Sequence, residues 1–228
     1  MSKPRTVISS IGSHGEKIVN ELNKQGLLEV DFMTQSELLE DRSINIFILF
    51  IIYCPEDHCI KKLDEIAGIH AKRTIIEIII TDRIERQNPY YIINNLVIDV
   101  AVKEISTFIK AFTDLGNFPS QACIDMADII DSLKNAGRLR MEEFTFRASK
   151  VYNTFSQLFI FLATTKKIKT IWLQIYLHTG DDFLDNVLEK LLDAINLNIG
   201  SEVDILWNVS YEEPLIKDKE NRYVLLFC

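Results

Sequence analysis

Glycine is scarce in this chain: its 228 residues include only eight, where average usage of roughly 7% would give about twice as many. Loops that wrap phosphate groups need several glycines, because only a residue without a Cβ lets the backbone approach a phosphate closely. The composition therefore disfavours a glycine-rich phosphate loop. Disorder and collagen-like repeats are excluded as well, since 47% of the residues are hydrophobic and can form a core.

Clusters of positive charge are also missing. Lys and Arg number 25 against 33 Asp and Glu, which gives a net charge of -8. Affinity for nucleic acid comes from clustered cations, and the densest basic group here, Lys166, Lys167 and Lys169, is interpreted as a solvated helix end. The charge balance therefore excludes a nucleic-acid binder.

Long apolar runs are absent too. The longest, residues 44–53, falls well short of the roughly 18 residues of a membrane span, and Asn45 interrupts it. The first residues lack the apolar stretch of a signal peptide. The four cysteines are therefore expected to be reduced thiols, and the chain is expected to be cytoplasmic without direct membrane contact.

Apolar runs and helical spacings alternate along the first part of the chain. Residues 44–53 and 74–80 are continuous runs of β-formers, which is typical of strands buried on both faces of a parallel sheet. Residues 5–11 and 27–33 are two further expected strands, with helices over 16–25, a short turn or helix over 34–40, and one opened by Pro55. This rhythm predicts a Rossmann-like, doubly wound sheet over residues 1–92.

The rest of the chain follows a different rhythm. Residues 92–115 show apolar spacing for a long central helix, and residues 124–133 for a shorter one, so residues 93–137 form a connecting region. Residues 138–228 are expected to form an α+β domain with an open sheet. Its predicted strands are 139–146, 169–178, 203–209 and 223–228, and its predicted helices are 148–163 and 181–197.

One segment after the long helix resembles a known motif. Residues 121–130, QACIDMADII, are similar to the synergy-loop pattern N-x-D-F-A-D-V of the FtsZ/tubulin superfamily. Cys123 stands in the place of the Asn, and both aspartates, Asp125 and Asp128, are kept. Weaker similarity to the family's strands and first glycine turn occurs in residues 7–20, 171–180 and 203–207, so the resemblance covers nearly the whole chain. It implies an α/β fold with a Rossmann-like parallel sheet, a long central helix and a C-terminal α+β domain.

The phosphate-binding loop of the family is not kept. The family has a loop reading G-G-G-T-G-S/T-G after its central strand, whose backbone N–H groups hold the nucleotide phosphates. Residues 53–59 stand in this place, and they contain no glycine. Pro55 has no N–H to donate, and Glu56 and Asp57 would repel phosphate oxygens. This departure from the family's pattern leads us to expect that the chain does not bind GTP or GDP at the family's site.

The two aspartates have two interpretations. By resemblance, Asp125 and Asp128 would reach the nucleotide pocket of a neighbouring subunit in a head-to-tail filament and polarise the attacking water. Alternatively, Asp125 is a helix cap and Asp128 an exposed first-turn acid that meets the helix dipole favourably. In either case no catalytic residue is expected to act within this chain's own site.

Two further groups are candidate binding residues. Gly12, Ser13, His14 and Gly15 lie between a strand and a helix, where they form either a weak anion-binding turn or only a tight turn. Cys54, His58 and Cys59 lie close in sequence, but tetrahedral zinc usually takes a second ligand pair elsewhere, and none is evident. We therefore expect structural thiols, no bound metal and no cofactor.

The resulting functional expectation is a non-catalytic FtsZ/tubulin-like protein, a pseudo-GTPase. It would act in the assembly or modulation of a cytoskeletal or cell-division filament, with itself or an intact FtsZ-like protein as partner. Two alternatives remain open. One is a divergent GTPase that completes its site on self-association, and the other is a generic α/β module that binds a protein or a small ligand.

Overall fold

A computed structural model of the chain describes residues 5–27, 30–41, 46–80, 86–94, 96–117, 126–134, 136–146, 160, 168–177, 189–199, 202–211 and 221–227. The chain divides into two compact units. The first unit comprises Met1–Lys110 and Ile130–Leu139, and the second comprises Ala111–Ile129 and Arg140–Cys228. Helix α4 (Ile98–Asn117), helix α5 (Met126–Leu133) and strand β6 (Arg138–Phe146) each contribute residues to both units.

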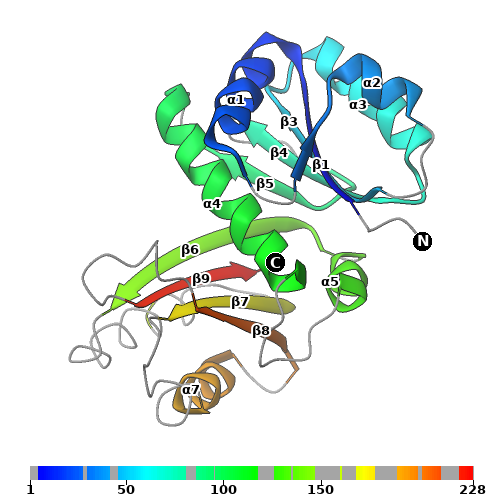
Figure 1. The fold of residues 1–228 in the computed structure, drawn as a ribbon. Helices are drawn as coiled ribbons and strands as arrows, with labels where there is room; N and C mark the ends of the chain where they lie inside the picture. Colours follow the sequence, from blue (N-terminus) through cyan, green and yellow to red (C-terminus); the bar gives the residue numbers. More distant parts are fainter. Residues whose placement is uncertain are drawn as a thin grey trace. The chain divides into compact units, whose positions relative to one another are not determined.

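The first unit contains the predicted parallel sheet (Figure 1). Its strands lie in the order β2-β1-β3-β4-β5-β6, and every neighbouring pair is parallel. The strands are β1 (Arg5–Ile11), β2 (Val30–Phe32), β3 (Ile46–Tyr53), β4 (Thr74–Ile80), β5 (Tyr90–Ile93) and the start of β6 (Arg138–Phe146). The helices are α1 (Gly12–Gln25), α2 (Gln35–Glu40), α3 (Asp57–Ile69), the first part of α4 (Ile98–Asn117) and the last part of α5 (Met126–Leu133).

Helices cover both faces of this sheet, which explains the unbroken apolar run of β3. Ile51 faces the core that contains Leu63 of α3. On the other face, the ring of Phe50 meets the ring of Phe108 of α4 edge to face, with centroids 6.2 Å apart. All of these side chains are buried, so β3 is a central strand with no polar face.

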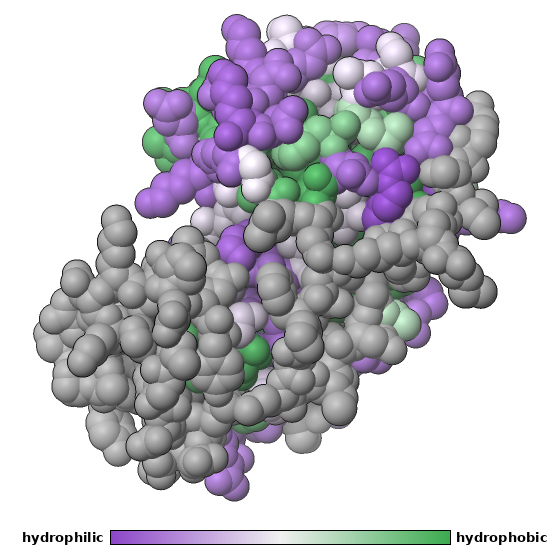
Figure 2. All heavy atoms as spheres, viewed as in Figure 1, coloured by the Kyte–Doolittle hydropathy of each residue, from purple (hydrophilic) through white to green (hydrophobic). Residues whose placement is uncertain are grey.

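Helix α1 has the amphipathic pattern of a surface helix. Its buried residues, Gly15, Ile18 and Leu22, recur at helical spacing and face the sheet. The surface that Figure 2 colours over α1 and α2 is mostly hydrophilic, as expected for their outward faces. Among the described residues, no helix combines the length and the hydropathy that a membrane crossing requires.

The structure corrects the predicted start of the long helix. Residues 90–93 form strand β5, and α4 begins only at Ile98. The aromatic and β-branched side chains of β5 favour a strand, and Tyr91 stacks on Phe108 with ring centroids 4.3 Å apart. Leu96, which the helical spacing placed on the buried face, is 66% exposed and precedes the helix.

Two other helix starts also differ from the prediction. Helix α1 begins directly after β1 at Gly12, because Gly12 takes a φ of +80° and turns the chain at once. Helix α3 begins at Asp57, two residues after Pro55, with Glu56 as its N-cap. The short helix expected over residues 34–40 is present as α2, and Thr34 and Glu37 form a capping box at its start.

The second unit combines a mixed sheet with helices, and it includes residues 111–129 in addition to most of the predicted α+β region 138–228. Its sheet has the order β6-β9-β7-β8, in which β9 runs antiparallel to both neighbours and β7 and β8 are parallel. Its further elements are β7 (Thr170–Leu177), α7 (Glu189–Ile199), β8 (Asp204–Tyr211) and β9 (Asn221–Phe227). The helix predicted over residues 148–163 and the first half of that over 181–197 lie almost entirely outside the described residues.

A buried chain of hydrogen bonds joins α4 to this second sheet. The Tyr176 hydroxyl donates to Asp114 Oδ2 at 2.8 Å, and the Asn208 side chain donates to the Asp114 carbonyl at 2.9 Å. Asn208 also donates to Gln174, which in turn donates to Ser210. These polar side chains are buried and hydrogen-bonded to one another within the second unit's core, while Asn208 Oδ1 has no partner among the described residues.

Candidate functional site

The turn after β1 and the loop after β3 meet at one edge of the first unit's sheet. Because β1 and β3 are parallel neighbours, with Ile11 opposite Tyr53, their carboxyl ends lie side by side. A Cβ placed on Gly12 would lie 3.0 Å from Cys59 Sγ and 3.9 Å from His58 Nε2. The glycine turn and the loop that were singled out in the sequence therefore come together in the fold.

Gly15 is explained by packing. A Cβ at this position would lie 2.5 Å from the backbone oxygen of Ile52 and 3.2 Å from Ser10 Cβ. Helix α1 can therefore lie this close to β1 and β3 only if residue 15 is glycine. Packing is therefore sufficient to explain why residue 15 is glycine, and no bound anion is needed for that explanation.

Ser13 and His14 lie in the first turn of α1. Ser13 is exposed, and His14 is half-buried. The Nε2 atom of His14 is buried and has no hydrogen-bond partner among the described residues. The role of this turn in binding an anion remains a prediction.

Several backbone donors of the loop after β3 are absent or used internally. Pro55 has no N–H, and the N–H of Glu56 donates to the Cys54 carbonyl at 2.9 Å. The N–H groups of Cys59 and Ile60 donate to the Glu56 carbonyl, at 2.9 and 3.1 Å. A phosphate-wrapping loop needs consecutive N–H groups that point at the ligand, and Pro55 and Glu56 interrupt such a run here.

The side chains of the same loop form a row. The sulfur of Cys59 lies 3.4 Å from His58 Nε2, and His58 Nδ1 lies 3.3 Å from Glu56 Oε2. Cys59 is only 1% exposed, and its sulfur also lies 3.9 Å from the Ile11 carbonyl oxygen. The sequence indicates His58 and Cys59 as candidate binding residues, whereas it indicates Glu56 only as a negative charge that repels phosphate.

Burial determines the chemistry of the two thiols. It raises the pKa of Cys59 above the ordinary thiol value, and it raises the pKa of Cys54 in the same direction. A nucleophilic cysteine needs the opposite shift, because the thiolate is the reactive form. The Cys59–His58 contact is therefore a poor arrangement for covalent catalysis.

The structure describes only one of the two synergy-loop aspartates. Asp128 is exposed in the first turn of α5, whereas Asp125 lies outside the described residues. Ile129 and Leu133 of the same helix are buried, so Asp128 lies on the opposite, solvent-facing side. This position suits both an interaction with another subunit and a favourable interaction with the helix dipole.

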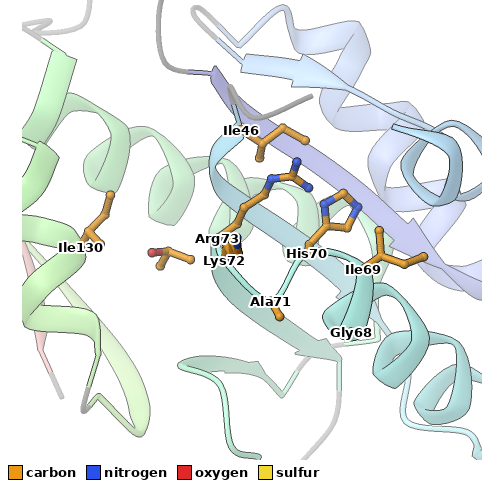
Figure 3. A pocket seen from close by; sticks show the side chains of 9 residues that line it. Ile46, Gly68, Ile69, His70, Ala71, Lys72, Arg73 and Ile130 are labelled. Carbon is orange, nitrogen blue, oxygen red and sulfur yellow. The ribbon is translucent and has the colours of Figure 1, made fainter. Parts of the chain in front are cut away.

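A cavity of about 490 Å³ lies at the other edge of the sheet, beside the first residues of β3 and β4 (Figure 3). His70 lines it, and the buried Nε2–H of this residue donates to the Leu38 carbonyl at 2.9 Å. Ligands of open parallel sheets bind at the carboxyl ends of the strands, and this cavity lies at the amino ends. The edge that carries Gly12 and Cys59 is therefore the better candidate site.

Comparison with solved structures identifies the fold. FtsZ from M. jannaschii, solved as an empty dimer, matches with a TM-score of 0.74 and 10% identity over 99% of this chain and 88% of that chain. TubZ from Bacillus thuringiensis serovar israelensis, solved as GDP-form protofilaments, matches with a TM-score of 0.69 and 8% identity over 99% and 88%. CetZ from Methanosaeta thermophila matches with a TM-score of 0.65 and 9% identity over 98% and 86%.

The chain therefore has the FtsZ/tubulin-superfamily fold, and the resemblance found in the sequence is confirmed at this level. Among the particular proteins with this fold, it is similar to FtsZ, TubZ and CetZ. No family model matches the sequence, and no curated protein matches it.

Proposed function

We propose that this chain is a non-catalytic FtsZ/tubulin-like protein that acts by self-association or by binding a filament-forming partner. It would serve a cytoskeletal or cell-division system in the cytoplasm, where free thiols such as those of Cys54 and Cys59 persist. The observation that carries the proposal is the loop after β3, which lacks the features of a phosphate loop.

Backbone and charge both support a site that does not hold GTP. The first donors of the loop are absent or used internally, and the side chains of His58 and Cys59 lie where the loop faces Gly12. The carboxylate of Glu56 is exposed beside them, so a triphosphate would meet negative charge at this edge. The similar structures include an FtsZ dimer and TubZ protofilaments, which motivates association as the retained role.

Titration with GTP or GDP tests the loss of nucleotide binding. We expect no saturable heat in isothermal titration calorimetry at nucleotide concentrations up to about 1 mM, the weak limit of ordinary specific affinities. An intact FtsZ titrated under the same conditions is the positive control. A dissociation constant in the micromolar range would contradict the proposal, and hydrolysis that rises with protein concentration would favour the divergent GTPase.

The exposed face of α5 is the proposed contact with the partner. We expect Asp128→Ala to reduce sedimentation of this chain, either alone or together with an intact FtsZ, at least threefold. Asp131→Ala is the matched control, because Asp131 lies on the same helix, is exposed and pairs with Lys134, the residue that follows the helix. Equal effects of the two substitutions would contradict a specific role for Asp128, and no sedimentation under any condition would favour a generic α/β module.

A further inference from the structure

Three residue types that bind zinc come together at the start of α3. One ligand atom from each of Glu56, His58 and Cys59 can be chosen so that all three lie within 4.8 Å of one another. Within the part of the chain that the structure describes, this is the single group of three or more His, Cys, Asp or Glu side chains with such spacing. It lies beside Gly12, at the carboxyl ends of β1 and β3.

The distance between the sulfur and the ring nitrogen fits a shared metal ion. Zinc bonds to sulfur at about 2.3 Å and to imidazole nitrogen at about 2.0–2.1 Å, so a tetrahedral angle places the two ligand atoms about 3.5 Å apart. Cys59 Sγ and His58 Nε2 lie 3.4 Å apart. The two atoms are thus already spaced for coordination without a backbone movement.

The other candidate ligand is also close to the ring. Glu56 Oε2 lies 3.3 Å from His58 Nδ1, so the carboxylate and the imidazole are already side by side. The backbone of Cys59 is fixed because its N–H donates to the Glu56 carbonyl in the first turn of α3. The thiol is buried while the side chains of His58 and Glu56 are more than half exposed, so a metal ion can reach the cluster from solvent.

We propose that Cys59 Sγ, His58 Nε2 and the Glu56 carboxylate bind one zinc ion, with a water molecule in the fourth position. Thiolate and imidazole favour Zn²⁺ over Mg²⁺ or Ca²⁺, which prefer sets of oxygen ligands. On binding, the thiol loses its proton and His58 Nε2 loses any proton it carries while Nδ1 remains protonated, and the charges of the thiolate and the carboxylate balance the ion.

This site differs from the sequence-based expectation of no metal. The sequence predicts no metal because zinc usually takes two ligand pairs that lie far apart in the chain, and no second pair is evident. Here the ligands come from one helix turn, and Glu56 is the member that this pattern does not include. The start of α3 at Asp57 places Cys59 inward and beside His58, and the sequence alone predicted an earlier start.

Cobalt substitution gives a direct test. The full chain is stripped with a chelator and titrated with CoCl₂ under reducing conditions. We expect a sulfur-to-cobalt charge-transfer band in the near ultraviolet and intense visible d–d bands of a tetrahedral ion, both saturating at one ion per chain. Addition of one equivalent of ZnCl₂ should remove these bands.

Single substitutions assign the ligands. His58→Gln changes a side chain that is 57% exposed, so the fold should persist, and cobalt affinity should fall at least tenfold. Cys59→Ala should abolish the charge-transfer band, and Glu56→Gln should weaken binding about tenfold or more. Cys54→Ser is the control, because it removes a half-buried thiol of the same loop that is outside the cluster, and the bands should persist.

Two outcomes would overturn the site. One is a cobalt spectrum without the charge-transfer band in the folded wild-type chain, since this excludes thiolate coordination. The other is wild-type cobalt affinity in His58→Gln together with an unchanged far-ultraviolet circular dichroism spectrum. Neither readout involves nucleotide, so failure of the metal site and failure of the proposed function can be distinguished.

Discussion

Replacement of Arg86 by methionine is expected to lower the free energy of unfolding by about 3–5 kcal/mol. The Nε–H of Arg86 donates to Glu77 Oε2 at 2.8 Å, and the Glu77 side chain has no exposed surface. The Arg86 side chain itself is only 16% exposed. Methionine would keep much of the apolar packing, but it would leave a buried carboxylate without its cation.

The remaining partners of Glu77 cannot replace that charge. The Tyr53 hydroxyl donates to Oε2 at 2.6 Å, and the Asn88 side chain donates to Oε1 at 2.8 Å. Burial, followed by the charge of Glu77, raises the pKa of Tyr53 far above its usual value, so this hydroxyl remains a neutral donor. Two neutral donors satisfy lone pairs, but they do not offset the cost of a buried negative charge.

Urea unfolding followed by circular dichroism measures the effect, and Arg5→Met is the matched control. Arg5 makes an ion pair of 2.6 Å with Asp31 at the surface, where its loss should cost less than about 1 kcal/mol. The double variant Glu77→Gln with Arg86→Met should regain part of the loss, because the buried charge is gone. A loss below about 1 kcal/mol in Arg86→Met would contradict the assigned role of this pair.

The Glu77 network also fixes the connection between two strands. Arg86 and Asn88 belong to the connection between β4 and β5. The backbone N–H of Glu77 donates to the Pro89 carbonyl at 2.9 Å, so side chain and backbone both fix this short connection to the sheet. We infer that these contacts of Glu77 anchor the start of β5 beside β4.

The strands of the first unit could be predicted because their signal is local. Runs such as residues 46–53 are apolar without interruption, and only a strand covered on both faces uses such a pattern. Strand β5 was missed because its four residues merge with apolar positions that also fit helical spacing. Residues 90–93 form a strand because they pair with β4, and the spacing of apolar residues in the sequence does not reveal this tertiary contact.

The candidate site was predictable only in part, for a similar reason. Parallel neighbours place Gly12 beside the loop after β3, and this follows from the order of elements alone. The contact of Cys59 with His58 depends instead on the residue at which α3 begins, and helix boundaries are the least certain part of a sequence-based prediction. The partners of Glu77 could not be predicted from the sequence either, because a single acidic residue in an apolar run does not indicate which basic residue will pair with it.

Replacement of Gly15 by alanine is the second substitution with a large expected effect. The new Cβ would lie 2.5 Å from the Ile52 carbonyl oxygen, which belongs to the central strand β3 and cannot rotate away. Helix α1 must then move off the sheet, which loosens the packing of Ile18 and Leu22. We expect a loss of about 3 kcal/mol in the free energy of unfolding, at the upper end for overpacked positions.

Gly68→Ala is the control for this substitution, and the pair also separates the two explanations of the glycine turn. Gly68 lies within α3, and a Cβ there would meet no atom within 4 Å, so alanine should be neutral or stabilise by up to about 1 kcal/mol. Both variants are measured by urea unfolding and by the change in melting temperature. If Gly15→Ala proves as stable as the wild type, packing does not explain the glycine, and an anion-binding turn gains support. If it is destabilised as expected, the contact with Ile52 is sufficient reason for the glycine, and the turn needs no phosphate to explain its sequence.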